Sequence, residues 1–118
     1  MVNVLTGPKG SGKTQQMIDL ANEAVKTSSG NVVLIKKRHT DTSSVDFNVR
    51  AICMADYADI TNIEEFKGFL YGMVAGNHDI ETIFIDGVLK QVDISIDNLS
   101  MFIDILKKLS EENKIEFY

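Results

Sequence analysis

Apolar and polar residues follow one another along the chain in blocks that predict alternating strands and helices. Continuous apolar runs at 32–35 and 83–85 are typical of strands covered on both faces, the second within a strand over 82–86. Apolar residues at helical spacing predict helices over 13–26, from a Thr61–Glu64 capping box to about Gly76, and over 99–109. Shorter segments at 2–6, 49–54 and 114–118 predict further strands, and the polar stretch 36–48 predicts a loop.

This order of elements indicates an α/β fold, because parallel strands need helical crossovers between them. We expect a three-layer sandwich with a mainly parallel sheet of about five strands. The chain has 118 residues, enough for one hydrophobic core, and no repeat, linker or charge block divides it. The sequence therefore predicts a single domain over 1–118.

Composition and charge exclude some classes of binding partner and indicate the cellular compartment. With 12 basic and 17 acidic residues the net charge is −5, which opposes a broad nucleic-acid surface because such surfaces need a basic face. The single cysteine, Cys53, reads as a small buried hydrophobe; it excludes an internal disulfide and a cysteine-rich metal site, and favours a reducing compartment. No apolar run reaches the roughly 18 residues of a membrane span, and the N-terminus lacks a signal-peptide pattern. The sequence thus predicts a cytoplasmic protein with no membrane partner.

A glycine-rich motif lies between the first predicted strand and the first predicted helix. It matches the pattern G-x-x-x-x-G-K-[ST] and consists of Gly7, Pro8, Lys9, Gly10, Ser11, Gly12, Lys13 and Thr14. Its glycines allow backbone N–H groups to converge on phosphate oxygens, and the helix N-terminus adds the positive end of its dipole. We expect Lys13 to reach the β- and γ-phosphates of a nucleotide and the Thr14 hydroxyl to ligate Mg²⁺. The motif thus predicts a nucleotide-binding site.

Asp86 ends the second apolar run, at the position of a Walker B aspartate. At the carboxyl end of a strand it would face the phosphate-binding motif and hold Mg²⁺ with Thr14, directly or through water. Lys13 and Asp86 are accordingly the candidate catalytic residues, acting through the phosphates and the metal. The next residue is Gly87, whereas many hydrolytic proteins of this class place there a carboxylate that orients the attacking water.

On these motifs the chain resembles the P-loop NTPases, and the order of its elements is similar to the RecA-like and thymidine-kinase-like branch. Ile35-Lys36 and Asp41-Thr42 are similar to the Ile-Lys strand end and the Asp-Thr pair of the kinases, whereas Ser43 replaces the kinase arginine. The size is also similar to that of small bacterial ATP-binding P-loop proteins of uncharacterised function. The resemblance implies a P-loop core in which the last strand lies beside the first and is buried or half-buried.

Other polar residues offer weaker candidates. The basic cluster at 36–39 could meet a γ-phosphate, but a solvated loop explains it more simply. Asp56 and Asp59 could replace the missing water-orienting carboxylate, although turn or capping roles are the simpler interpretation. Surface or core roles outweigh metal binding or base stacking for four residues, which are His39, His78, Tyr57 and Tyr71. Lys90 and Gln91 could sense the γ-phosphate, but exposed polar loop residues have the same pattern.

The function that these residues predict is Mg²⁺-dependent nucleotide binding with slow or partner-stimulated hydrolysis. ATP is favoured over GTP because the guanine-reading Asn-Lys-x-Asp motif is missing, and the nearest match, 113–116, ends in Glu. Two alternatives stay open: a non-catalytic module that binds nucleotide to regulate a partner or its own assembly, and a small phosphotransferase similar to thymidine kinase. An unknown protein partner fits the first alternative, and a homodimer fits the exposed edges of an open sheet.

Overall fold

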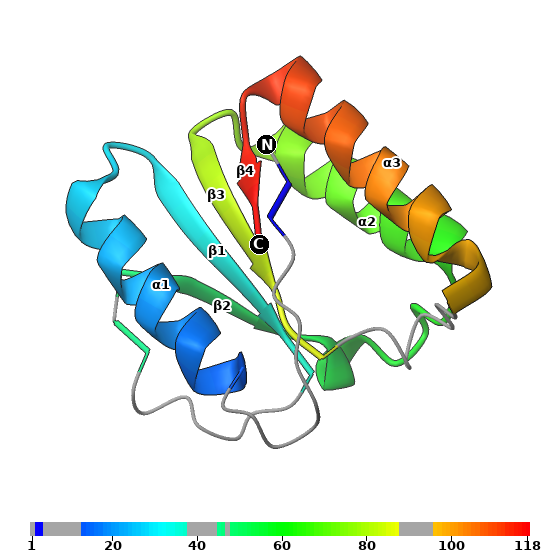
Figure 1. Cartoon of the computed structure of the whole chain (residues 1–118), viewed down its shortest axis with the longest axis horizontal. Helices are drawn as coiled ribbons and strands as arrows, with labels where there is room; N and C mark the ends of the chain where they lie inside the picture. The colour runs from blue at the N-terminus through cyan, green and yellow to red at the C-terminus, as the bar shows by residue number, and fades with distance from the viewer. Residues whose placement is uncertain (1, 4–12, 38–44, 47, 88–95) are drawn as a thin grey trace.

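Helices and strands alternate along the chain, as Figure 1 shows. The computed structural model describes residues 2–3, 13–37, 45–46, 48–87 and 96–118, with only the backbone described at 13–14 and 96–97. In chain order the elements are α1 (Lys13–Thr27), β1 (Asn31–Lys36), β2 (Arg50–Cys53), the 3₁₀ helix η2 (Met54–Tyr57), α2 (Ile63–Gly76), β3 (Ile80–Ile85), α3 (Ile96–Asn113) and β4 (Glu116–Phe117). The first predicted helix is confirmed to within one residue, whereas the last begins earlier and ends later than predicted. Within these residues, no helix is long and apolar enough to cross a bilayer.

The described strands form one sheet in which every pair of neighbours is parallel. Its order is β2-β1-β3-β4, and Ile35 of β1 lies opposite Ile85 of β3. An α/β fold with a parallel sheet is thereby confirmed. The sequence predicts about five strands, but the described part of the chain contains four. The first predicted strand lies largely outside that part, and its Val2 forms an isolated parallel bridge with Phe117.

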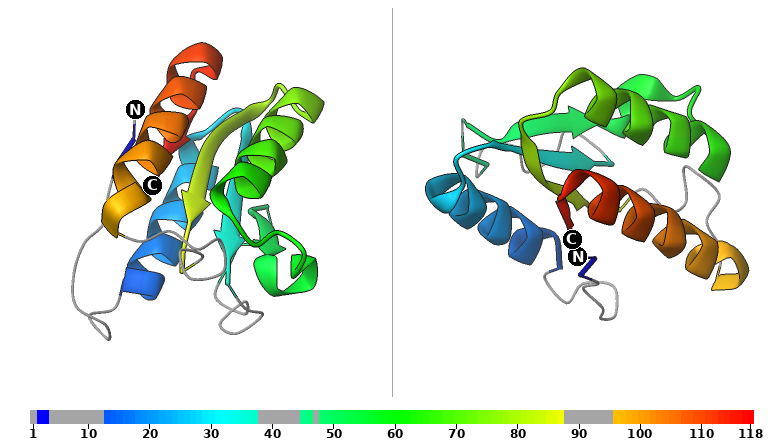
Figure 2. Two further views of the ribbon diagram at one scale, coloured as in Figure 1. Left: turned by 90° about the vertical axis from the view of Figure 1, so that its right-hand side faces the viewer. Right: turned by 90° about the horizontal axis from the view of Figure 1, so that it is seen from above.

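Helices cover both faces of the sheet. Successive side chains of a strand point to opposite faces, so a strand of consecutive apolar residues has an apolar surface on each face that a helix can bury. Val32 and Leu34 belong to a buried cluster with α1, whereas Val33 and Ile35 belong to a larger one with α2 and α3. Figures 1 and 2 show α1 on one side of the sheet and α2 on the other. On the α2 side, α3 contacts both α2 and β4. This arrangement is compatible with a three-layer sandwich.

The α2 helix begins one residue later than its predicted capping box. Asn62 is the N-cap, and its side-chain oxygen accepts a hydrogen bond from the Glu65 N–H at 2.9 Å. The Glu65 carboxylate in turn accepts from the N–H and the hydroxyl of Thr61, both at 2.9 Å, and these bonds lower the pKa of Glu65. The predicted pairing of Thr61 with Glu64 is therefore wrong, and the physical reason is that asparagine is a better N-cap than threonine.

The β4 strand is the last strand of the described sheet and lies between β3 and the first residues of the chain. It pairs with β3 through Thr82 and Ile83 on one side. On the other side, Val2 bridges to Phe117, and the Asn3 N–H donates to the Phe117 carbonyl at 2.8 Å. The strand thus connects the segment that precedes the glycine-rich motif with the centre of the fold.

Burial along the C-terminal segment largely agrees with the prediction for 114–118. Ile115 and Phe117 are buried, with exposed fractions of 2% and 0%, and Tyr118 is half-buried. Lys114 is the exception, because it is exposed and has a φ of 57°. This left-handed residue belongs to the turn after α3, so the predicted strand starts too early.

Candidate functional site

The strands β1, β2 and β3 all end at one edge of the sheet, called here the carboxyl edge and formed by Lys36, Cys53 and Ile85. In Figure 1 this edge is at the lower end of β1 and β3, and the first turn of α1 lies near it. A helix next to a parallel strand in such a fold runs back along the sheet, so its N-terminus returns to this edge. In open α/β sheets, ligands bind outside the carboxyl ends of the strands.

The predicted phosphate-binding motif ends in the first turn of α1. Lys13 and Thr14 are the first two helical residues, so the predicted helix start is confirmed. The rest of the motif, 7–12, and the side chains of these two residues lie outside the described part of the structure. Their contacts with phosphate and metal therefore stay predictions. Met17 and Ile18 are buried against the sheet, which anchors α1 immediately after its first turn.

Asp86 is the first residue after β3 and is half-buried at the carboxyl edge. Its N–H donates to the Ile35 carbonyl at 2.9 Å, which continues the ladder between β1 and β3 by one step. Gly87 follows with a φ of 72°, a left-handed conformation that glycine adopts without strain. The predicted place of Asp86 at the carboxyl end of a strand is confirmed, and its role as a Mg²⁺ ligand stays a prediction.

Lys36 is the last residue of β1, which corrects the sequence prediction that it starts a solvated loop. It lies opposite Cys53 in β2, and only 4% of it is exposed. The reason is that the pairing of β1 with β2 continues one residue beyond the last apolar position of β1. The apolar carbons of a lysine side chain can be buried in such a place. A buried cation therefore lies one strand away from Asp86.

The 3₁₀ helix η2 follows β2 directly and also lies at the carboxyl edge (Figure 1). The Ala55 N–H donates to the Lys37 carbonyl at 3.2 Å, and the Cys53 thiol donates to the same carbonyl at 3.6 Å. Cys53 is buried, as predicted. Asp56 and Tyr57 are exposed, Tyr57 to 52%. The segment predicted as a strand through residue 54 thus turns into a helical turn that presents polar groups at this edge.

The structure does not bring the remaining described candidates together in one site. Tyr71 is half-buried against the core between α2 and the sheet, which confirms its packing role. Asp59 is exposed after η2, and His78 is exposed in the turn before β3, at the opposite edge from Asp86. No group of three His, Cys, Asp or Glu among the described residues is arranged to hold a metal ion. Several candidates lie outside those residues, namely Arg38, His39, Asp41, Thr42, Ser43, Lys90 and Gln91.

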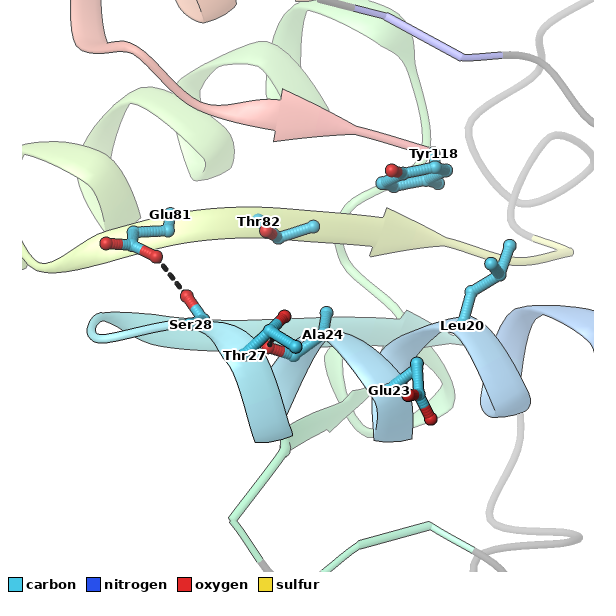
Figure 3. A pocket seen from close by; sticks show the side chains of 8 residues that line it. All are labelled: Leu20, Glu23, Ala24, Thr27, Ser28, Glu81, Thr82 and Tyr118. Atoms are coloured by element: carbon cyan, nitrogen blue, oxygen red, sulfur yellow. Dashed lines mark hydrogen bonds between the residues drawn. The ribbon is translucent and has the colours of Figure 1, made fainter.

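Sequence reasoning missed an open groove of about 380 Å³ between α1, β3 and Tyr118 (Figure 3). The hydroxyls of Ser28 and Ser29 donate to the Glu81 carboxylate, and these bonds lower the pKa of Glu81. Near the end of the chain, the Tyr118 ring stacks on Phe84 with centroids 4.6 Å apart. No local pattern could have shown this groove, because Ser28 and Glu81 are 53 positions apart in the chain.

Comparison with protein families and with curated proteins identified no match for this chain. No protein-family model matches the chain, and no curated protein matches it at a significant level. The chemistry of the carboxyl edge and of the motif before α1 is therefore the basis for assigning a function.

Proposed function

We propose that this protein binds ATP with Mg²⁺ at the carboxyl edge of its sheet. The motif 7–14 would surround the phosphates, with Lys13 on the β- and γ-phosphates and with Thr14 and Asp86 on the metal. The main support is that α1 begins with Lys13 and Thr14 near the edge where Asp86 follows β3. A glycine-rich segment, a helix N-terminus and a carboxylate at a strand end are the groups that a phosphate chain and its metal require.

We infer that the chain has a P-loop NTPase core of the RecA-like order. Two features support this inference: the motif directly precedes α1, and β4 lies between β3 and Val2. The second is the place that the RecA-like resemblance implies for the strand after Asp86. Phosphotransfer similar to that of thymidine kinase has less support, because Ser43 and Gly87 stand where those kinases have arginine and glutamate.

Hydrolysis by this site is proposed to be slow or to depend on a partner. Gly87 offers no carboxylate to orient water, and its φ of 72° turns the chain at this point. A partner that supplies a carboxylate or an arginine would accelerate the reaction by positioning water or stabilising charge in the transition state. The same observation favours a second candidate function, a non-catalytic module that binds ATP to regulate a partner or its own assembly.

Isothermal titration of the full chain with Mg·ATP and Mg·GTP tests the binding. We expect Mg·ATP to bind, and Lys13→Ala to weaken binding about tenfold to a hundredfold, as for the loss of a charge-assisted hydrogen bond. Lys26→Ala is the matched control and should leave the affinity unchanged. Lys26 is exposed on the same helix, and its Nζ lies 3.7 Å from Oε2 of Glu23. If the wild type binds neither nucleotide, the proposed function is refuted.

Single-turnover hydrolysis separates the candidate functions once binding is established. Phosphate release that depends on Lys13 identifies an NTPase. Binding without such release identifies a regulatory module, and phosphate that appears on a nucleoside or a small acceptor identifies a phosphotransferase.

A further inference from the structure

A buried lysine stands next to Asp86 at the carboxyl edge. Lys36 ends β1, which lies between β2 and β3, and 4% of it is exposed. Because Ile35 lies opposite Ile85 and the Asp86 N–H donates to the Ile35 carbonyl, Lys36 and Asp86 are neighbours on adjacent strands. A lysine side chain therefore begins beside the residue that the proposed function assigns to the metal.

The two-residue period of a strand places Lys36 and Asp86 on the face of the sheet that α1 covers. Along β1, Leu34 packs against α1, and Lys36 follows at the two-residue period of a strand. Along β3, Phe84 packs in the same cluster, and Asp86 follows it two residues later with its N–H still in the ladder. The first turn of α1, which starts at Lys13, lies at this end of the same face.

We propose that Lys36 contacts the terminal phosphate of the bound nucleotide and makes the site prefer a nucleoside triphosphate to a diphosphate. This inference rests on the proposed function. The strand order has β4 and Val2 on one side of β3 and β1 on the other. In the proposed site Asp86 would hold the metal together with the β- and γ-phosphates, so the terminal phosphate would lie beside Asp86 and its neighbour Lys36.

The chemistry of lysine fits this role better than a role in hydrolysis. Its four-carbon stem is longer than the roughly 4.8 Å between neighbouring strands, so an ammonium group carried by β1 can reach a phosphate bound beside Asp86. The ammonium group has three donors and no acceptor, so it binds phosphate oxygens and cannot take a proton from water. Because Gly87 offers no carboxylate after Asp86, Lys36 would hold a γ-phosphate without activating the water that would attack it.

Substitutions at Lys36, with a control at Lys37, test this role in the full chain. Lys36→Met removes the charge and keeps an unbranched side chain, and Lys36→Gln replaces it if the methionine variant does not fold. Lys36→Arg keeps the charge. Lys37→Met is the matched control, because it removes one charge from the next residue. Each protein is titrated with Mg·ADP and with the Mg complex of the β,γ-imido analogue of ATP, after circular dichroism and a thermal melt have shown that it is folded.

The ratio of the two affinities is the decisive quantity, because a merely structural role would weaken both ligands equally. Lys36→Met should weaken the triphosphate analogue about tenfold to a hundredfold and leave Mg·ADP within about twofold of wild type. Lys36→Arg should keep most of the preference, and Lys37→Met all of it. Equal losses for both ligands, or an unchanged ratio in Lys36→Met, overturn the role of Lys36 while nucleotide binding stands. If the wild type binds neither ligand, the proposed function fails as well.

Discussion

Replacement of Phe117 by alanine should remove a large part of the stability of this protein. The ring of Phe117 has an exposed fraction of 0% and belongs to the core between the sheet, α2 and α3. Its backbone also holds the first residues of the chain: Val2 bridges to it, and the N–H and side-chain amide of Asn3 donate to its carbonyl at 2.8 and 3.2 Å. The substitution keeps these backbone bonds and removes only the ring, so its effect measures the packing.

The expected loss follows from the burial of the ring. Truncation of a fully buried phenylalanine costs about 3–5 kcal/mol, because transfer free energy is lost and a cavity remains. The total stability of a small domain is about 5–15 kcal/mol, so this change removes a third or more of an average value. With an unfolding entropy of about 2.1 cal/mol/K per residue over 118 residues, a loss of about 4 kcal/mol lowers the melting temperature by about 16 °C.

Urea unfolding followed by circular dichroism measures this loss directly. With an m value of about 2 kcal/mol/M, the midpoint should fall by about 2 M urea. Met101→Ala is the control, because Met101 lies on α3 with 49% of its surface exposed, and it should change stability by less than about 0.5 kcal/mol. A loss below about 1 kcal/mol for Phe117→Ala at an unchanged m value would refute the burial of this ring in the core.

Three further predictions concern α2, the turn before β1 and the carboxylate of Glu81 in the groove beside α1. Asn62→Ala should lower the free energy of unfolding in urea by about 1 kcal/mol, because the N-cap acceptor is lost; no change would argue against this cap. Gly30→Ala should lower the melting temperature, because the added Cβ would overlap the Asp79 carbonyl. Gly72→Ala should raise the melting temperature through a gain of about 0.5–1 kcal/mol, because there is open space around Gly72 in α2. A higher melting temperature for Gly30→Ala than for Gly72→Ala contradicts the prediction. The pKa of Glu81 is lowered from 4.5 by its hydrogen bonds, so its stabilisation is complete above pH 4.5 and is lost as the pH falls through the lower folded value. In paired thermal melts, Glu81→Gln should therefore lose stability at pH 7 and progressively less as the pH falls toward the folded value, and a pH-independent loss would count against this.

The elements could be predicted because their core residues recur at the period of a strand or a helix. The run 32–35 and the start of α1 at Lys13 are cases in which a local pattern was sufficient. Element ends were predicted less well, because hydrogen bonds set them. Asn62 competes better than Thr61 for the N-cap of α2, and the ladder carries Lys36 into β1 although its charge is typical of a loop.

In the candidate site, too, features set by local sequence could be predicted, whereas features set by long-range packing could not. The start of α1 at Lys13 and the strand-end position of Asp86 depend on local features, and both could be predicted from the spacing of residues. The burial of Lys36 next to Asp86 depends on which strand lies beside β3, which no local pattern encodes. The hydrogen bonds from Ser28 to Glu81 depend on the same long-range packing.

The position of β4 has a consequence for folding on the ribosome. Among the described residues, β4 alone pairs with Val2 and Asn3, and Asn3 donates to a carbonyl 114 positions further along the chain. At about 5–20 residues per second, synthesis of the intervening chain takes roughly 6–23 s. During this time α1, β1 and β3 can emerge before β4, the strand with which Val2 and Asn3 pair, has been made. The pairing of Val2 with β4 is therefore completed last, and under the proposed function the nucleotide site would be complete only after Phe117 has been added.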